Sequence, residues 1–234
     1  MALPLCWFRM RVIAGQYRSR TLQAPSGLGT RPTSDRLRET LFNVLAPRIE
    51  GAAFLDLYAG SGAVGIEALS RGAASATFVE RAPAALAVLR ANLASLGVSE
   101  GFWIHPGSVR GWLRRFDSEP GPGPKAGSVP GSKMGSALAS EPGQKPVLSQ
   151  AFDLVFLDPP YDAAEEYAAT LGLLGGAARG LLSAGALVIA EHRGKGGAKV
   201  KLEQRYGELE LTRLLEQGDA ALSFYAHRAM AASE

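Results

Sequence analysis

The chain has 234 residues, of which 47% are hydrophobic and 20% are charged, and its formal net charge is +3. This length fits one α/β domain with a small appendage, and the composition is that of a soluble globular protein with a substantial core. No apolar run reaches the roughly 18 to 20 residues of a membrane-spanning helix, and residues 1–8 lack the features of a signal peptide. The single cysteine, Cys6, excludes an intramolecular disulfide framework and a cysteine-rich metal site. These features predict a cytoplasmic protein.

The positive charge is concentrated near the N-terminus. Residues 1–40 contain seven arginines and two acids, a net charge of +5, so the rest of the chain is net −2. Arginine is the side chain best suited to bind phosphate, because its planar guanidinium donates paired hydrogen bonds. A polyanion-binding N-terminus and an ordinary solvated basic face are both compatible with this pattern. The arginines are Arg9, Arg11, Arg18, Arg20, Arg31, Arg36 and Arg38.

A small β-hairpin is predicted near the start of the chain. Residues 11–14 and 21–24 can pair on either side of a basic tip formed by residues 15–20. An isolated two-stranded hairpin is marginally stable in water, so this hairpin should lean on the main domain or on a ligand. We therefore divide the chain into an N-terminal extension with a hairpin, residues 1–30, and one larger domain, residues 31–234.

A helix is predicted after the hairpin, starting near Thr33 or Ser34. Either side chain can cap the first turn through its hydroxyl oxygen. The large apolar residues fall on one face, which is typical of a helix that packs against a core. Pro47 is expected to help end the helix, because proline has no backbone hydrogen to donate. The apolar residues are Leu37, Leu41, Val44 and Leu45.

A glycine-rich loop follows the next predicted strand, which spans residues 54–58. Gly60, Gly62 and Gly65 satisfy the spacing G-x-G-x-x-G between a strand and a helix. In that context the motif indicates nucleotide binding, because glycines permit a tight turn and a close approach of the backbone to a ligand. The pattern favours a nucleoside-containing cofactor over a purely structural turn.

Acidic residues distinguish between the possible cofactors. A second strand, residues 76–79, ends in Glu80, whose carboxylate can accept hydrogen bonds from ribose hydroxyls. Asp56 lies inside the first strand and Asp158 follows a later one, and both should face the same crevice. These acids would repel the pyrophosphate of a dinucleotide, but they suit S-adenosylmethionine, whose sulfonium and ammonium groups are positive. An NAD-dependent oxidoreductase is the alternative, because the glycine motif alone also fits a dinucleotide.

Helices and strands alternate through the middle of the chain. A helix over residues 83–96 should bury its leucines and point Asn92 outward. A strand over residues 102–105 leads to Ser108, where the crevice would receive an adenine ring. A short helix is predicted over residues 109–116. The alternation of strand and helix is typical of a parallel sheet covered by helices.

Residues 117–150 differ in composition from the rest of the chain. Proline, glycine and serine supply six residues each, 18 of 34, without hydrophobic periodicity. This composition predicts a flexible insertion within the domain, because the next strand begins directly after it. The later elements are a strand over 152–157, a helix over 163–174, a strand over 186–190 and a hairpin of 209–215 and 221–226. The complete pattern predicts an α/β fold with a seven-stranded, mostly parallel sheet and an antiparallel C-terminal hairpin.

The strand over residues 152–157 ends in Asp158-Pro159-Pro160-Tyr161. Two consecutive prolines cannot extend the strand, so the chain leaves the sheet rigidly at the edge where open α/β sheets bind ligands. Asp158 and the Pro159 carbonyl are two acceptors that can hold both hydrogens of an –NH₂ group, and Tyr161 offers a flat face for a base. A proline-rich turn whose aspartate caps the next helix is the simpler alternative.

These motifs resemble those of the class I S-adenosylmethionine-dependent methyltransferases, and more narrowly those of the bacterial 16S ribosomal RNA guanine-N2 methyltransferases. Residues 10–23 are similar to that family's opening hairpin, 31–43 to its lead-in helix, 55–72 to its cofactor loop and 158–161 to its catalytic turn. The insertion at 117–150 departs from the family pattern, as does Ser108, where many relatives have an acid. The catalytic turn also occurs in DNA adenine and cytosine amino-methyltransferases, so only the N-terminal block narrows the substrate to RNA.

The resemblance implies a Rossmann-like fold, S-adenosylmethionine as cofactor, and a guanine in ribosomal RNA of the small subunit as substrate. It implies no metal, no membrane partner and a monomer. The catalytic residues would be Asp158, Pro159, Pro160 and Tyr161. The cofactor-binding residues would be Asp56, Tyr58, Ala59, Gly60, Ser61, Gly62, Glu80, Arg81, Ser108 and Asp158. The RNA-binding residues would be Arg11, Arg18, Arg20 and Arg31. A DNA amino-methyltransferase and a non-catalytic RNA-binding module are the remaining alternatives.

Overall fold

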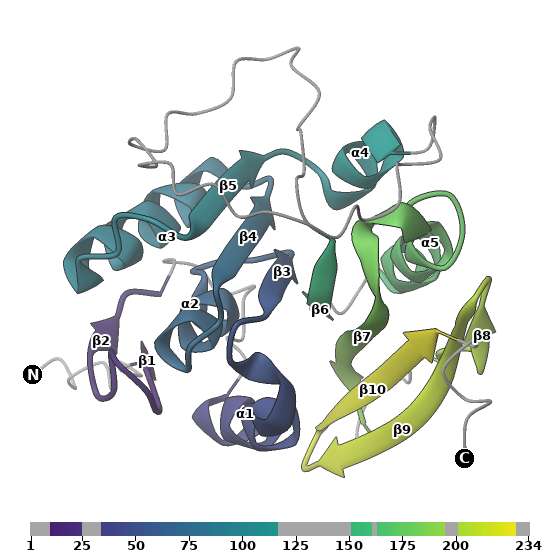
Figure 1. The fold of residues 1–234 in the computed structure, drawn as a ribbon, viewed down its shortest axis with the longest axis horizontal. Coiled ribbons are helices and arrows are strands. Elements are labelled where there is room, and N and C mark those ends of the chain that lie inside the picture. Colours follow the sequence, from purple (N-terminus) through teal and green to yellow (C-terminus); the bar gives the residue numbers. More distant parts are fainter. Residues whose placement is uncertain (1–9, 25–33, 117–150, 161–162, 195–200, 228–234) are drawn as a thin grey trace, which may run out of the picture.

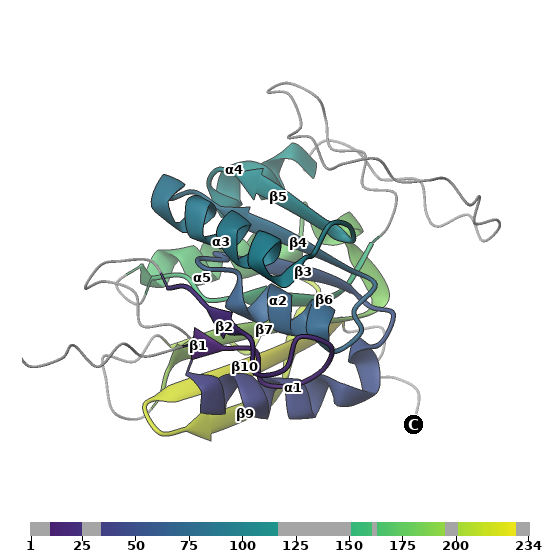
Figure 2. The same ribbon diagram turned by 90° about the vertical axis from the view of Figure 1, so that its left-hand side faces the viewer.

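The computed structural model describes residues 10–24, 34–116, 151–160, 163–194 and 201–227. The predicted extension at 1–9 and the insertion at 117–150 lie outside these residues, as do the expected boundary at residue 30 and the helix-capping alternative Thr33. The described parts form a central twisted sheet with helices on both faces, and a small separate hairpin (Figures 1 and 2). None of the described helices combines the length and the hydrophobicity needed to cross a bilayer.

The central sheet has eight strands in the order β5-β4-β3-β6-β7-β10-β9-β8. The parallel strands are β3 (Ala53–Leu57), β4 (Ser75–Glu80), β5 (Phe102–Pro106), β6 (Phe152–Leu157) and β7 (Leu182–Arg193). The antiparallel strands are β8 (Arg205–Tyr206), β9 (Leu209–Gln217) and β10 (Ala220–His227). The predicted α/β class and the antiparallel C-terminal hairpin are confirmed. The predicted number of seven strands is wrong, because the sheet also contains β8. This strand is too short to show an alternating pattern in the sequence.

Helices cover both faces of the sheet. One face is covered by α1 (Asp35–Ile49), α2 (Ala63–Ser70) and α3 (Pro83–Leu96), and the other by α4 (Val109–Leu113) and α5 (Ala164–Leu174). Short 3₁₀ turns, η1 (Arg114–Phe116) and η2 (Arg179–Leu181), follow α4 and α5. From Leu154 onward the side chains of β6 alternate: Leu154 and Phe156 face α1, whereas Val155 and Leu157 face α5. This alternation is that of a strand buried on both sides.

Two details of the helices differ from the prediction. Pro47 lies inside α1, which continues to Ile49, because Pro47 is exposed in the last turn and Ile49 packs into the core. Asn92 is 1% exposed instead of pointing outward. Its amide accepts a hydrogen bond from the Gln23 amide at 2.8 Å and donates one to the Ser61 carbonyl at 3.0 Å. Polar partners on neighbouring segments thus bring Asn92 into the interior, which helix periodicity alone could not indicate.

The N-terminal hairpin packs on the main domain, as predicted. Its strands are β1 (Met10–Arg11) and β2 (Thr21–Leu22), shorter than expected, with Met10 opposite Leu22. Met10 and Leu22 are buried against residues of α2, α3 and β4. The Glu67 carboxylate on α2 accepts hydrogen bonds from the Ile13 and Ala14 amides at 2.7 and 3.0 Å. A buried acid of the main domain therefore holds the turn of the hairpin in place.

Candidate active site

The glycine loop connects β3 to α2 and brings the helix directly onto the sheet. Gly62 precedes α2 with φ at +79°, a left-handed conformation that glycine adopts without strain. A Cβ atom at Gly65 would lie 2.3 Å from the Phe78 ring on β4, so only glycine permits this close packing. The tight turn predicted for the motif is present, and Gly65 in addition allows a close contact between helix and strand.

Asp56 lies beneath this loop on β3. Its side chain accepts a hydrogen bond from the Gly65 amide at 2.9 Å, at the start of α2, and is 2% exposed. Burial raises the pKa of Asp56 to about 7, the Gly65 hydrogen bond opposes the shift, and the nearby Glu80 carboxylate adds to it. Asp56 thus supports the loop from below, and a direct contact with the cofactor stays a prediction.

Glu80 at the end of β4 is the second acid of the loop. One of its oxygens accepts from the Gly60 amide at 2.8 Å, and the other accepts from the Ala82 amide at 2.7 Å. Each carboxylate oxygen has more than one acceptor position, so Glu80 can also accept hydrogen bonds from ribose hydroxyls. The neighbouring Arg81 is exposed, and Ser61 and Ala59 are buried. A contact of Ala59, Ser61 or Arg81 with the cofactor stays a prediction.

Tyr58 ties the loop to the opposite face of the sheet. Its φ of +63° is uncommon for a bulky residue and has to be held by its surroundings. The hydroxyl group forms hydrogen bonds with Thr170 at 2.7 Å and with Glu166 at 2.9 Å, both on α5. Burial is the main reason that the pKa of Tyr58 lies well above its usual value. The Tyr58 hydroxyl therefore joins the loop to α5, the helix after the proline turn, and the predicted contact of Tyr58 with the cofactor stays a prediction.

Asp158 directly follows β6, beside the glycine loop. Leu57 of β3 pairs with Leu157, and Leu157 pairs with Ala190 of β7. The residues that follow these positions therefore leave neighbouring strands at one edge of the sheet. Burial raises the pKa of Asp158 well above its usual range, and the carboxylates of Glu191 and Asp56 raise it further. A carboxylate in this position is stabilised by a ligand that brings hydrogen-bond donors or positive charge.

The proline turn is held on its inner side by α5. Pro159 is buried, and its carbonyl lies 3.5 Å from the Tyr167 hydroxyl, which donates a shorter hydrogen bond of 2.8 Å to the Glu191 carbonyl. The Pro160 carbonyl accepts from the Ala163 amide at 2.9 Å. At 3.5 Å the bond to Pro159 is weak, so this carbonyl remains a competent acceptor for a ligand amine. Tyr161, the predicted base-stacking residue, lies outside the described residues.

Sequence reasoning missed two residues of this region, Tyr167 and Glu191. Tyr167 shares the buried stripe of α5 with Leu171 and Leu174, so its inward position could have been found from helix periodicity. Glu191 lies near the carboxyl end of β7, and an acid in that place on a strand adjacent to β6 was the available signal. The sequence does not show that the Tyr167 hydroxyl lies between the Pro159 and Glu191 carbonyls, because this depends on the packing of α5 on β6 and β7.

Ser108 lies at the same edge, after β5. Its hydroxyl accepts a hydrogen bond from the Gly111 amide at 3.2 Å and caps α4, and the residue is exposed. Pro106 of β5 pairs with Glu80 of β4, so Ser108 follows directly beyond the second acid. This position agrees with the expected place of an adenine ring, and the contact itself stays a prediction.

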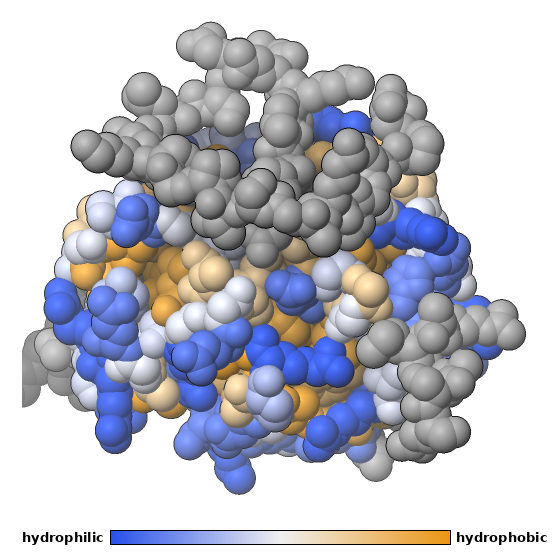
Figure 3. All heavy atoms as spheres, in the orientation of Figure 1, coloured by the Kyte–Doolittle hydropathy of each residue, from blue (hydrophilic) through white to orange (hydrophobic). Residues whose placement is uncertain are grey.

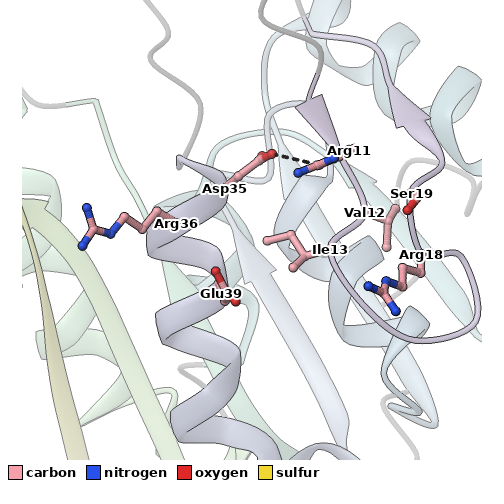
Figure 4. A pocket seen from close by; sticks show the side chains of 8 residues that line it. All are labelled: Arg11, Val12, Ile13, Arg18, Ser19, Asp35, Arg36 and Glu39. Carbon is pink, nitrogen blue, oxygen red and sulfur yellow. Dashed lines mark ion pairs between the residues drawn. The ribbon is translucent and has the colours of Figure 1, made fainter.

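The predicted RNA-binding arginines have different environments. Arg11 and Arg18 are exposed and line a hollow of about 430 Å³ between the hairpin and α1 (Figure 4). Arg11 is 3.6 Å from the Asp35 carboxylate, whereas Arg20 donates to the Ser95 carbonyl at 2.7 Å and so fastens the hairpin to α3. Arg31 lies outside the described residues. The hollow is lined by Arg11, Val12, Ile13, Arg18, Ser19, Asp35, Arg36 and Glu39.

Arg36 is the lining arginine that the RNA-binding prediction did not include. In Figure 4 its side chain extends away from the hairpin, whereas Arg18 points toward α1. In the space-filling view, hydrophilic side chains lie over β1, β2 and α1 (Figure 3). Arg11, Arg18 and Arg36 thus line the hollow together with Asp35 and Glu39.

The acidic side chains at this edge of the sheet fit S-adenosylmethionine. Four carboxylates lie at or near the carboxyl ends of four adjacent strands, next to the glycine turn. They belong to Asp56, Glu80, Asp158 and Glu191. Such a site suits a ligand with positive charge and several hydrogen-bond donors. Within the described ranges, these acids form no group that could hold a metal ion. A mostly parallel sheet with this loop, acid and proline turn defines a class I methyltransferase, an enzyme that uses S-adenosylmethionine.

Comparison with known proteins identifies the family. The family described as conserved hypothetical protein 95 matches residues 10–119 and 135–226. The chain belongs to this family and is an RsmD-like methyltransferase, which confirms the predicted class of enzyme and its cofactor over the NAD-dependent alternative.

Individual relatives agree with this assignment. The chain is 32% identical over 219 residues to "Putative rRNA methyltransferase YlbH" of Bacillus subtilis, covering 94% of this chain and 100% of the relative. It is 56% identical over 88 residues to "Ribosomal RNA small subunit methyltransferase D" of Escherichia coli, covering 38% and 44% of the two chains. A solved structure of a putative methyltransferase from Escherichia coli, yhhF, has 33% identity and a TM-score of 0.68 and covers 94% of this chain and 99% of its own.

Proposed function

We propose that this protein transfers a methyl group from S-adenosylmethionine to the exocyclic N2 amine of a guanine in 16S ribosomal RNA. The observation that supports this most directly is the adjacency of the glycine loop and the proline turn. They follow the paired residues Leu57 and Leu157 of neighbouring parallel strands, so a cofactor on the loop and a base at the turn would meet. The names of the relatives support ribosomal RNA as the substrate.

The chain's own residues account for activation of the amine. The lone pair of a nucleobase amine is delocalised into the ring, which makes the amine a poor nucleophile. Asp158 and the Pro159 carbonyl accept its two hydrogens and localise the lone pair, and the two prolines fix these acceptors before the substrate arrives. Because its pKa is raised, Asp158 is also suited to accept the proton that the amine loses on methylation. S-adenosylmethionine, when bound, supplies an electrophilic methyl group.

The remaining predicted contacts complete the proposal. Glu80 would accept hydrogen bonds from the cofactor ribose, Gly60 and Gly62 would let the backbone approach it, and Tyr161 would stack the target base. Loop bases that can be splayed out of the RNA are the usual targets of sequence-specific RNA enzymes. Other cofactor contacts would come from Asp56, Tyr58, Ala59, Ser61, Arg81 and Ser108.

The basic hollow would bind the RNA backbone. Arg11 and Arg18 are exposed at the hairpin, and their guanidinium groups would contact phosphates, with Arg20 and Arg31 nearby in the chain. This arrangement would present a loop of the small-subunit RNA to the acidic edge of the sheet. We further propose that the protein acts as a cytoplasmic monomer on the small ribosomal subunit or its assembly intermediate.

Transfer of a labelled methyl group tests the proposal. Small ribosomal subunits from cells that lack this activity, naked 16S RNA and duplex DNA would be compared as acceptors, and the labelled nucleoside would be identified after digestion. Label in N2-methylguanosine of the subunits or the RNA is the expected result. Label in adenine or cytosine of the duplex would establish a DNA amino-methyltransferase instead. RNA binding without any label transfer would indicate a non-catalytic RNA-binding protein.

A further inference from the structure

Asn92 of α3 joins the glycine loop to the segment that leaves the N-terminal hairpin. The residue is 1% exposed, and its side-chain amide uses both its acceptor and its donors. The oxygen accepts from the Gln23 amide at 2.8 Å, and the nitrogen donates to the carbonyls of Gln23 and Ser61, each at 3.0 Å. Gln23 directly follows β2, and Ser61 belongs to the loop. Because buried polar groups without partners are costly, these bonds fix both segments relative to α3.

The loop beside Asn92 is enclosed by the same helix and by the hairpin. Leu89, one turn before Asn92 on α3, packs so closely that a Cβ atom at Gly62 would lie 2.2 Å from it. Ser61 is 8% exposed, and its hydroxyl donates a long hydrogen bond to the Met10 sulfur of β1 at 3.9 Å. Two consecutive residues of the loop are therefore in contact with α3, and one of them also contacts the hairpin.

The hairpin is fixed in turn by α2, the helix that follows the loop. The Gln16 amide donates to the Ser70 carbonyl at 2.7 Å, and the Ser70 hydroxyl accepts from the Tyr17 amide at 2.9 Å. A Cβ atom at Gly15 would lie 1.7 Å from the Ser70 carbonyl oxygen, so only glycine permits this docking. The turn of the hairpin thus rests on α2 while its exit is bound by Asn92. A displaced hairpin would therefore also disturb the segment that Asn92 binds.

We propose that Asn92 is a positioning residue that holds the Ser61 backbone in the shape that receives S-adenosylmethionine and fastens this shape to the hairpin. The hairpin thereby serves the cofactor site in addition to binding RNA. The inference rests on the proposed place of the cofactor at the glycine loop. Without the amide, the loop of the free protein would also occupy other conformations, and the apparent Kd of the cofactor would rise in proportion. Bound cofactor would restore the loop, so turnover at saturation would change little.

Calorimetric binding of S-adenosylmethionine to the complete chain tests the inference with Asn92→Ala. The Kd should rise about tenfold, which corresponds to a binding-competent loop in about one tenth of the free protein. In methyl transfer to small subunits, the KM for the cofactor should rise equally, while kcat should stay within about twofold. Asn43→Ala, which removes an exposed amide of α1, is the matched control and should leave the Kd unchanged. An unchanged Kd in Asn92→Ala would overturn the inference.

A second control separates loss of positioning from loss of stability. Leu45 of α1 is fully buried in a different core cluster from Leu89, so Leu45→Ala should lower the unfolding temperature. It should leave the Kd of S-adenosylmethionine unchanged, because it does not remove a contact of the loop. An equal rise of the Kd in Leu45→Ala and Asn92→Ala would show that cofactor binding responds to general destabilisation, and would overturn the inference.

A substitution in the hairpin tests its connection to the cofactor site. Gly15→Ala should displace the hairpin from α2 and raise the Kd, although Gly15 lies outside the loop. Gly51→Ala is the matched control, because its φ of +73° is close to the +82° of Gly15 but a Cβ there meets no atom within 4 Å. In the double variant Gly15→Ala/Asn92→Ala the two effects should not multiply, because both act through one connection. An unchanged Kd in Gly15→Ala, or effects that multiply, would refute the connection. If Asn92→Ala fails to fold, Gly15→Ala decides alone.

The outcome separates the two proposals. A wild-type protein that binds S-adenosylmethionine and methylates guanine N2, with an unchanged Kd in these variants, would remove only the role of Asn92. A wild-type protein that binds S-adenosylmethionine but does not methylate 16S RNA would remove the proposed function, while a raised Kd in the variants would still support the role of Asn92.

Discussion

Two regions of the molecule carry opposite charge in opposite environments. The edge of the sheet holds Asp56 and Asp158, whose pKa values are raised chiefly by burial. The hollow beside the hairpin holds Arg11 and Arg18, which are exposed, and Arg11 forms only a long ion pair with Asp35. Buried acids respond strongly to every neighbouring charge, whereas exposed pairs are screened and contribute little to stability.

This difference assigns different tasks to the two regions. A desolvated carboxylate has few partners until a ligand arrives, so the acidic edge is suited to chemistry that needs a defined acceptor. A solvated arginine exchanges water or Asp35 for phosphate at small cost, so the basic hollow is suited to general binding of a polyanion. Substitutions should therefore have large effects at the edge and small, salt-dependent effects at the hollow.

Asp158→Asn should have the largest effect. The amide keeps the size of the side chain, but its oxygen is a weaker acceptor than a carboxylate and cannot take up a proton, so methyl transfer should fall by a factor of about 10² to 10³. Single-turnover label transfer to small subunits measures the loss, while RNA affinity should stay near that of the wild type. Asp219→Asn, at the exposed turn between β9 and β10, is the control. Unchanged turnover in Asp158→Asn would contradict the proposed acceptor.

Gly65→Ala should destabilise the acidic edge by overpacking. The added methyl group would meet the Phe78 ring at 2.3 Å, and such overpacking typically costs about 1–3 kcal/mol. Urea denaturation measures the change. Gly172→Ala in α5 is the matched control, because a Cβ there meets no atom within 4 Å, and alanine favours the helix. Equal stability of the two variants would show that the contact between α2 and β4 is loose.

Asp56 should make the free protein less stable as pH rises. Its folded pKa is about 7, above the value of about 3.9 expected in the unfolded chain. The folded state therefore binds more protons between these values, and its stability is greatest below pH ~4 and is lost progressively up to pH ~7. Asp56→Asn should flatten this dependence in denaturation curves recorded across the range. A slope identical to that of the wild type would contradict the raised pKa.

Arg11→Ala and Arg18→Ala together should have the smallest effect. The slope of log RNA affinity against log salt concentration should become less steep by about 0.7 for every phosphate that the protein no longer neutralises. Turnover at saturating RNA should not change. Filter binding at several salt concentrations measures the slope. Arg205→Ala, on the far edge strand β8, removes an equal type of charge as control. If Arg205→Ala lowered the slope as much as the hairpin variants do, the whole protein would attract RNA non-specifically.

The sequence by itself determined the elements and the motifs, because these depend on local chemistry. β6, α3 and the Ser34 cap were predicted at their observed positions from apolar runs, periodicity and a hydroxyl before a helix. The proline turn followed from the missing N–H groups of Pro159 and Pro160. Parallel pairing then placed the glycine loop beside Asp158, since strand ends with these signals share one edge of an α/β sheet.

Tertiary structure decided which side chains meet across the elements. Tyr58 reaches Thr170, which is 112 positions away, and Asn92 turns inward to bind Gln23 and Ser61. Periodicity assigns a residue to a face, but the partner on that face depends on how helices and strands pack. For the same reason the raised pKa values of Asp56 and Asp158 could not be predicted, because desolvation exists only after the sheet and its helices have closed around these acids.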